Sequence, residues 1–119
     1  MKLRELMKLV GAETLTSGAP LDVDIDRVYA TNRISDILSE ATEATLLVTG
    51  LTSSQALIAG ELAGIAAICF VDGKRPDAAT VEKAVRYAFD KALVVSREDM
   101  CGTCARLNAC LADKSGKAP

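Results

Sequence analysis

The residues best equipped for chemistry are three cysteines near the carboxyl terminus. Cys101, Cys104 and Cys110 form a C-x2-C-x5-C pattern in a segment with helical periodicity. Thiolates bind zinc or an iron–sulfur cluster, and C-x2-C is the usual first half of such a site. On an ideal helix Cys101 and Cys104 share a face, whereas Cys110 is rotated about half a turn from Cys101. A four-ligand site would therefore need a second chain or a distorted helix.

Two other roles for the cysteines remain open. Cys104 falls on an apolar stripe with Leu107 and Leu111, which favours structural cysteines, because free cysteine is among the most buried residue types. A C-x-x-C redox pair is the third role, but we expect the pair to lie inside the helix, away from the amino-terminal dipole that lowers a thiol pKa. Cys69 lies in an apolar run and is expected to be a small core residue.

The chain has no histidine, which excludes a histidine base, a Ser-His-Asp triad and histidine metal ligands. Acid–base catalysis would rest on carboxylates, lysine, cysteine or tyrosine. Asp72 and Lys74 could act as such a pair, but charged residues in a turn are usually solvated. We therefore expect no catalytic residues, no enzyme activity and no cofactor, with zinc or an iron–sulfur cluster at the cysteines as the alternative.

Three polar loops, residues 49–54, 72–77 and 96–99, each follow an apolar run. They contain hydroxyl groups, glycines that allow close backbone approach, helix starts with free N–H groups, and basic side chains, a combination suited to a phosphate or another anion. The candidate ligand contacts are Thr49, Gly50, Thr52, Ser53, Asp72, Gly73, Lys74, Arg75, Ser96 and Arg97. The alternative is that the hydroxyls cap helices, the glycines serve turns and the basic side chains are solvated. The sequence contains neither a dinucleotide-binding G-x-G-x-x-G motif nor a P-loop.

The elements that must position these loops alternate between apolar runs and helices. Residues 46–48, 66–71 and 92–95 are runs typical of strands buried on both faces, and single helices separate them. This alternation implies right-handed crossovers and a mainly parallel sheet, whose strand-end loops meet at one edge. The predicted fold class is therefore α/β, as a three-layer α/β/α sandwich. A more polar strand over residues 23–30, with its phase broken at Asp26, is expected towards an edge of the sheet.

Helix boundaries are predicted from periodicity and capping signals. The first helix is expected over residues 2–10 and ends at Gly11; a short strand over 12–16 and a turn over 17–20 follow. The later helix starts are predicted at Asn32, at Thr52 with Gln55, at Pro76, and at Ser96 with Asp99. The buried stripe of the fourth helix is expected at Val81, Ala84, Val85 and Ala88. We expect a single domain over residues 1–112 and a disordered tail over residues 113–119.

The composition narrows the class of partner. The 119 residues include 14 Lys and Arg against 16 Asp and Glu, a net charge of −2, and few aromatics. This balance disfavours nucleic-acid binding, which needs a basic surface or base-stacking side chains. No apolar run approaches the length of about 20 residues that crosses a bilayer, and charges interrupt the amino terminus where a signal peptide would be apolar. A cytoplasmic protein without membrane contact is expected.

The ordered set of motifs resembles the DRTGG domain, and it is similar to the amino-terminal domain of HPr kinase/phosphorylase. The matching segments are residues 45–50 (TLLVTG), 61–67 (ELAGIAA), 69–77 (CFVDGKRPD) and 105–107 (ARL). The resemblance therefore extends from about Thr45 to Leu107. The chain has Gly50-Leu51-Thr52 where the family often has Gly-Asp-Arg, and Val71-Asp72-Gly73 where it often has Thr-Gly-Gly.

The resemblance implies a non-catalytic module that regulates an enzyme. DRTGG domains occur in some phosphotransacetylases and in pyrophosphatases that carry CBS domains, and they often self-associate. The P-loop half of HPr kinase has no counterpart here, so kinase activity is not implied. We expect a stand-alone, homodimeric regulatory module that binds a small anionic metabolite or nucleotide and acts on a protein encoded nearby. The alternative from the residues is an accessory protein that carries a metal or an iron–sulfur cluster on Cys101, Cys104 and Cys110.

Overall fold

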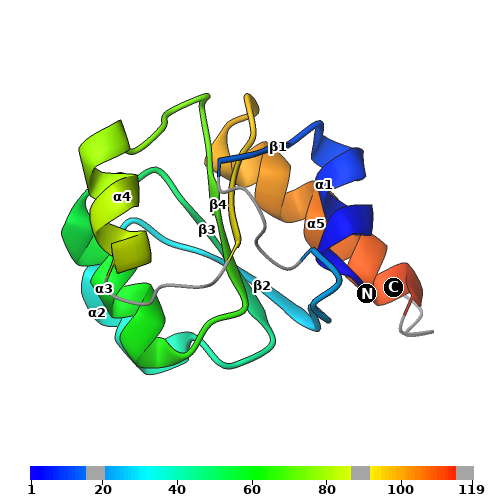
Figure 1. Cartoon of the computed structure of the whole chain (residues 1–119). Helices are drawn as coiled ribbons and strands as arrows, with labels where there is room; N and C mark the ends of the chain where they lie inside the picture. Colours follow the sequence, from blue (N-terminus) through cyan, green and yellow to red (C-terminus); the bar gives the residue numbers. More distant parts are fainter. Residues whose placement is uncertain (16–20, 87–91, 115–119) are drawn as a thin grey trace.

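A computed structural model describes residues 1–15, 21–86 and 92–114. Within these ranges, a sheet of five strands has the order β1-β5-β4-β3-β2 (Figure 1). The strands are β1 (Glu13–Thr14), β2 (Arg27–Ala30), β3 (Thr45–Thr49), β4 (Ala67–Phe70) and β5 (Ala92–Val95). The strands from β2 to β5 run parallel, and β1 pairs antiparallel with β5. The predicted parallel alignment of the three apolar runs is therefore confirmed.

Helices cover both faces of the sheet. They are α1 (Leu3–Val10), α2 (Ile34–Glu40), α3 (Ser54–Ala63), α4 (Ala78–Arg86) and α5 (Met100–Lys114). Figure 1 shows α1 and α5 on one side of the sheet and α2, α3 and α4 on the other. The three-layer α/β/α architecture is confirmed. In the described part of the chain, no helix is both long and apolar enough to cross a membrane.

Alternation along the central strands divides the core into two clusters. In β3, Leu46 and Val48 face α1 and α5, whereas Leu47 packs on the opposite side with residues of α2 and α3. The next strand repeats this pattern, with Cys69 on the α1–α5 side and Ile68 on the other. Because both faces are covered, every residue of these strands is buried. This explains why they read as continuous apolar runs.

The polar strand expected over residues 23–30 divides where its phase breaks. Asp24 forms an isolated bridge with Lys2, and only Arg27–Ala30 pairs with β3. Between them, the N–H groups of Asp26 and Arg27 both donate to the carbonyl of Ala44. The second half is the edge strand β2, as expected. The first half instead belongs with the chain entering α1.

Two boundaries near the amino terminus follow the sequence signals. Helix α1 ends at Gly11, which adopts a left-handed conformation with φ of 60°. The strand expected over residues 12–16 is the two-residue β1. The turn expected over 17–20 lies outside the described residues, as do Ala88 and the side chains of Ala84 and Val85 from the expected stripe of α4. Val81 of that stripe does pack against the core.

The starts of α3, α4 and α5 differ from the predictions, as does the end of α5; the start of α2, which also differs, is described with the site below. Helix α3 is capped by Ser53, not Thr52, because the Ser53 hydroxyl accepts the Ala56 N–H at 3.4 Å. Helix α4 begins after Pro76, and Asp77 caps it by accepting the Thr80 N–H at 2.7 Å. Helix α5 continues to Lys114, so the first two residues of the predicted tail are helical; residues 115–119 lie outside the described ranges.

The third corrected start is that of α5. Its cap is the carboxylate of Asp99, which accepts the N–H of Gly102 at 2.6 Å. Ser96, expected to take part in this cap, instead lies fully buried beneath the loop. The caps of α3 and α4 lie one residue from the predicted start and that of α5 lies three residues from it, because several residues in each loop can cap and the sequence does not rank them.

Candidate functional site

The parallel strands bring four loops to one edge of the sheet, which we call the rim. The rim consists of the residues that follow β2, β3, β4 and β5, namely 31–33, 50–53, 71–77 and 96–99. Ligands of open parallel sheets bind beyond the carboxyl ends of the strands, where helices begin. The three loops chosen from the sequence do share this edge. The loop after β2 is a fourth member that the sequence argument did not include.

Asn32 connects the loops after β2 and β3. Its Oδ1 accepts the N–H of Gly50 at 2.8 Å and the hydroxyl of Thr49 at 3.3 Å. The predicted role of Asn32 as the cap of α2 is wrong, because Arg33 holds the cap position and the Asn32 side chain points to β3. A Cβ on Gly50 would come within 3.4 Å of Asn32 Oδ1. A glycine here thus permits close approach between the two loops.

The buried hydroxyl of Thr49 supports the turn that follows β3. Thr49 is fully buried, and its Oγ1 accepts the N–H of Leu51 at 3.1 Å while donating to Asn32. Its hydroxyl is therefore used within the fold, as in the alternative to a ligand site, but it serves a turn and does not cap a helix as that alternative expected. Thr52 and Ser53 follow at the surface, half-buried and exposed respectively. Helix α3 begins at the next residue, Ser54.

The loop after β4 is tied to the loop after β5 by its backbone. Asp72 and Gly73 have positive φ angles of 59° and 67°. Their N–H groups donate to the carbonyls of Glu98 at 2.8 Å and Ser96 at 2.9 Å. The Gly73 amide is therefore used within the fold and does not face a ligand. This turn exposes the side chains of Asp72 and Lys74 to solvent.

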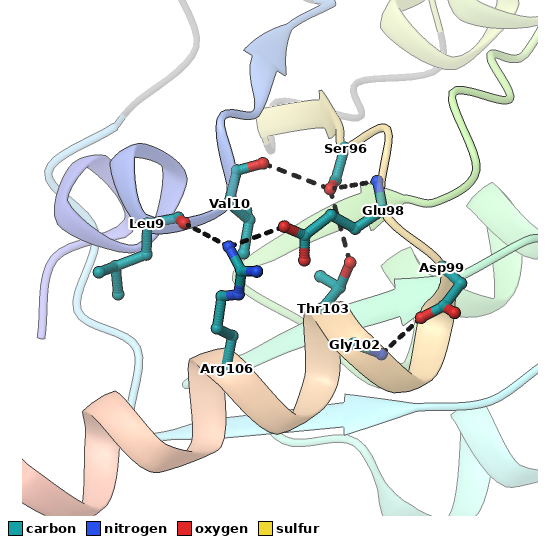
Figure 2. Close-up of polar contacts among 8 residues, drawn as sticks. All are labelled: Leu9, Val10, Ser96, Glu98, Asp99, Gly102, Thr103 and Arg106. Carbon is teal, nitrogen blue, oxygen red and sulfur yellow. Dashed lines mark hydrogen bonds and ion pairs between the residues drawn. The ribbon is translucent and has the colours of Figure 1, made fainter.

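Polar contacts anchor the loop after β5 to the helices beneath it (Figure 2). The Ser96 hydroxyl accepts the N–H of Glu98 at 3.2 Å and lies 3.5 Å from both the Val10 carbonyl and the Thr103 hydroxyl. Arg106 of α5 pairs with Glu98 at 2.7 Å and reaches the Leu9 carbonyl. Ser96 therefore has a structural role under the rim.

The basic residues of the rim fall into two groups. Arg75 forms an ion pair of 2.8 Å with Glu13 of β1, which fixes it at the edge of the sheet. Lys74 and Arg97 are exposed, and neither side chain has an ion pair or hydrogen bond with any residue that the structure describes. They lie on the loops after β4 and β5, which are adjacent strands.

Acidic groups of the rim offset part of the positive charge of its basic side chains. Asp77 caps α4, and its hydrogen bonds with Thr80 hold the pKa of this carboxyl below its usual value. Asp72 is exposed beside Lys74, and Glu98 is engaged by Arg106. The rim is thus mixed in charge. Lys74 and Arg97 are its free cations among the described residues.

The cysteines separate by environment. Cys69 is a core residue, as predicted: 1 % of its surface is exposed, and burial raises the pKa of its thiol to about 12. Cys101 is exposed, Cys104 is half-buried, and the Cys110 side chain lies outside the described part. Across the described side chains, no three metal-binding groups converge. The zinc or iron–sulfur alternative thus gains no support from the residues that can be placed.

One sequence expectation about the cysteines is wrong. We expected the C-x-x-C pair inside the last helix, but α5 begins at Met100 with Asp99 as its cap. Cys101 is therefore in the first turn and Cys104 in the turn that follows. The expected position of the pair within the helix was wrong because the sequence suggested a helix that starts near Ser96, three residues before its actual cap, Asp99.

Comparison with known proteins bears on the fold. No family model matches this sequence, and no curated protein matches it. A solved structure that does match contains the CBS and DRTGG domains of the regulatory region of Clostridium perfringens pyrophosphatase, complexed with its activator, diadenosine tetraphosphate. The TM-score is 0.65 at 10% sequence identity, over 89% of this chain and 45% of the other. The chain thus spans less than half of that structure, and the likeness establishes a shared α/β fold.

Proposed function

We propose that this chain is a non-catalytic regulatory module of the DRTGG type, which forms a homodimer and binds a small anionic metabolite or nucleotide at the rim. The observation that carries the proposal is the pair of exposed cations, Lys74 and Arg97, on adjacent loops beside the start of α3. The similarity of fold to a regulatory region that binds a polyphosphate activator supports the same class of role.

The rim has suitable dimensions for such a ligand. The strands β5, β4 and β3 are neighbours, so the loops that carry Arg97, Lys74 and Ser53 span about 10 Å at the usual strand spacing. A helix start attracts negative charge because its first N–H groups have no partner within the helix. The two exposed cations, Lys74 and Arg97, and the start of α3 would therefore contact different parts of one phosphate-bearing molecule.

The structure divides the candidate residues into contacts and supports. Direct contacts are proposed for Thr52, Ser53, Asp72, Lys74 and Arg97, whereas Gly50, whose N–H is bonded to Asn32, is proposed as a support. Thr49 and Ser96 are buried, the Gly73 amide is bonded to Ser96, and Arg75 is paired with Glu13. These four are proposed to hold the loops in position.

Thermal-shift measurements with defined compounds test the ligand. ATP, ADP, diadenosine tetraphosphate and acetyl phosphate would each be added at millimolar concentration to the full chain. A ligand present at a hundredfold excess over its dissociation constant stabilises the folded state by about 2.7 kcal/mol, which raises the melting temperature measurably. An unchanged melting temperature with all four would reject binding of these phosphate classes.

A pair of variants locates the site. The double substitution Lys74→Gln and Arg97→Gln should abolish the thermal shift, because it removes both free cations of the rim. Lys114→Gln is the matched control, since the last residue of α5 lies about 20 Å along the helix from Met100. A shift that survives the double variant, or that is lost in the control, would place the ligand elsewhere.

Exposed apolar side chains support the homodimer. Helix α3 buries Leu57 and Ala59 against the sheet, yet its outer side exposes 57% of Ile58 and 75% of Leu62. Helix α2, which packs against α3, exposes 50% of Leu38. A helix that is apolar on both sides is typical of one covered on both sides. We call Leu38, Ile58 and Leu62 the α2–α3 face and propose it as the contact with a second copy.

A further inference from the structure

The first turns of α5 place an exposed cysteine, Cys101, near Cys104, which packs against the core cluster between the sheet and helices α1 and α5. Cys101 and Cys104 are separated by two residues, directly after the Asp99 cap and the loop that follows β5. Gly102 lies between them, and a Cβ there would come within 2.9 Å of Asp99 Oδ1. Figure 2 shows this capped turn, with the Asp99 carboxylate above the Gly102 N–H.

The spacing suits a reversible disulfide. Residues three apart on a helix have Cα atoms about 5 Å apart, within the range that disulfides span. Their Cβ atoms are about 5–6 Å apart, somewhat more than a disulfide allows, so the turn must tighten for the bond to form. At a helix start this is feasible, because the first N–H groups have no partner within the helix. The resulting disulfide would be strained and easily reduced.

The two thiols differ in environment. Cys101 is exposed. Cys104 is half-buried, and its Sγ accepts a hydrogen bond of 3.1 Å from Asn108 Nδ2. Burial raises the pKa of Cys104, the Asn108 contact opposes that rise, and the charge of nearby Cys101 adds to it. This asymmetry distinguishes an accessible attacking thiol from a protected resolving thiol.

We propose that Cys101 and Cys104 form a redox-active dithiol that exchanges with low-molecular-weight disulfides. The Cys101 thiolate attacks one sulfur of the external disulfide, forming a mixed disulfide and releasing the first thiolate. Cys104 then gives up its proton and attacks Cys101 Sγ, forming the internal disulfide and releasing the second thiolate. Two protein thiols are oxidised, one external disulfide is reduced to two thiols, and the two protein protons end on the released thiols. This role is independent of any ligand at the rim.

Oxidised glutathione is the probe for the test. The reduced full chain would be incubated with it, quenched with acid, alkylated and digested with trypsin. Cleavage after Arg97 and Arg106 isolates residues 98–106, which contain both cysteines of the pair and neither Cys69 nor Cys110. The expected peptide is two hydrogens lighter than the dithiol form and carries no alkyl group, and dithiothreitol restores its alkylation. A doubly alkylated peptide, or one linked to another cysteine, would overturn the proposal.

Single variants test the assigned order of attack. Cys104→Ser should trap one glutathione stably on Cys101. Cys101→Ser should slow glutathione addition at Cys104 by at least about tenfold, because that thiol is half-buried and burial raises its pKa. Cys110→Ser is the control and should leave the internal disulfide unchanged. Equal trapping rates in the first two variants would refute the assignment of attacking and resolving thiols.

Discussion

Asn32 shows how a single side chain organises the rim. Its sequence context, just before a short helix, suggested a cap, but its Oδ1 accepts from Thr49 and Gly50 on the neighbouring strand. The same atom thereby fixes the distance between two loops that the chain separates by 17 and 18 residues. A capping residue and a loop-bridging residue look alike in sequence, because both need a short polar side chain at a turn.

We predict that Asn32→Ala destabilises the chain by about 1 kcal/mol, because the Gly50 N–H and the Thr49 hydroxyl lose their common acceptor. Urea denaturation would measure the loss. Asn32→Asp should lose less than the alanine variant, because a carboxylate oxygen can accept the same two bonds. Equal losses in the two variants would mean that the hydrogen bonds at Asn32 do not stabilise the fold.

The environments of other residues in the core and at the rim differ in how far the sequence predicts them. The burial of Cys69 follows from its place in an apolar run between two covered faces. The internal role of Ser96 does not follow from sequence, because the Val10 carbonyl that its hydroxyl contacts is 86 positions away. Contacts of this kind depend on how α1 packs beside β5, which local patterns do not encode.

The packing and the start of helix α3 differ in how far the sequence determines them. Its alanines and Gly60 allow close packing, and the structure gives Gly60 little room: a Cβ there would lie 2.8 Å from Ile65 Cδ1 and 3.3 Å from Ile68 Cδ1. Close packing was expected from the small residues alone. The helix start was missed by one residue, because Thr52 and Ser53 are both good caps and the choice between them depends on the preceding turn.

We predict that Gly60→Ala destabilises the chain by about 1 kcal/mol. Alanine adds about 1 kcal/mol of helix propensity, but overpacking against a fully buried side chain typically costs about 1–3 kcal/mol. Ile65→Val removes the crowding Cδ1 atom. The double variant should therefore be more stable than the sum of the two single changes, as measured by chemical denaturation. Additive losses would show that Ile65 does not limit the space at Gly60.

At the scale of the whole molecule, the alternation of runs and helices was sufficient to predict the layer architecture. Parallel order follows from that alternation because right-handed crossovers leave few other arrangements. The antiparallel pairing of β1 and the place of the loop after β2 in the rim depend on how the first 30 residues fold back. Those residues lack long apolar runs, so their pairing was only partly predictable.

The homodimer proposal gives a prediction at this scale. Sedimentation at micromolar concentration should show a dimer, and Ile58→Gln with Leu62→Gln should convert it to a monomer without unfolding, because both side chains are on the surface. Leu9→Gln is the matched control, since Leu9 is 40% exposed on α1, on the opposite side of the sheet. A monomeric wild-type chain, or dissociation caused by the control, would exclude the α2–α3 face as the dimer contact.

The two-residue strand β1 has a consequence for aggregation. Glu13 and Thr14 are both exposed on the outer side of β5, and Arg75 holds Glu13 in place. Long, flat, apolar edge strands can pair with further chains and lead to fibrils. A short, charged edge strand offers an incoming strand few backbone N–H and C=O groups with which to pair. At this edge strand, the protein thereby discourages fibril growth and leaves helical surfaces free for reversible association.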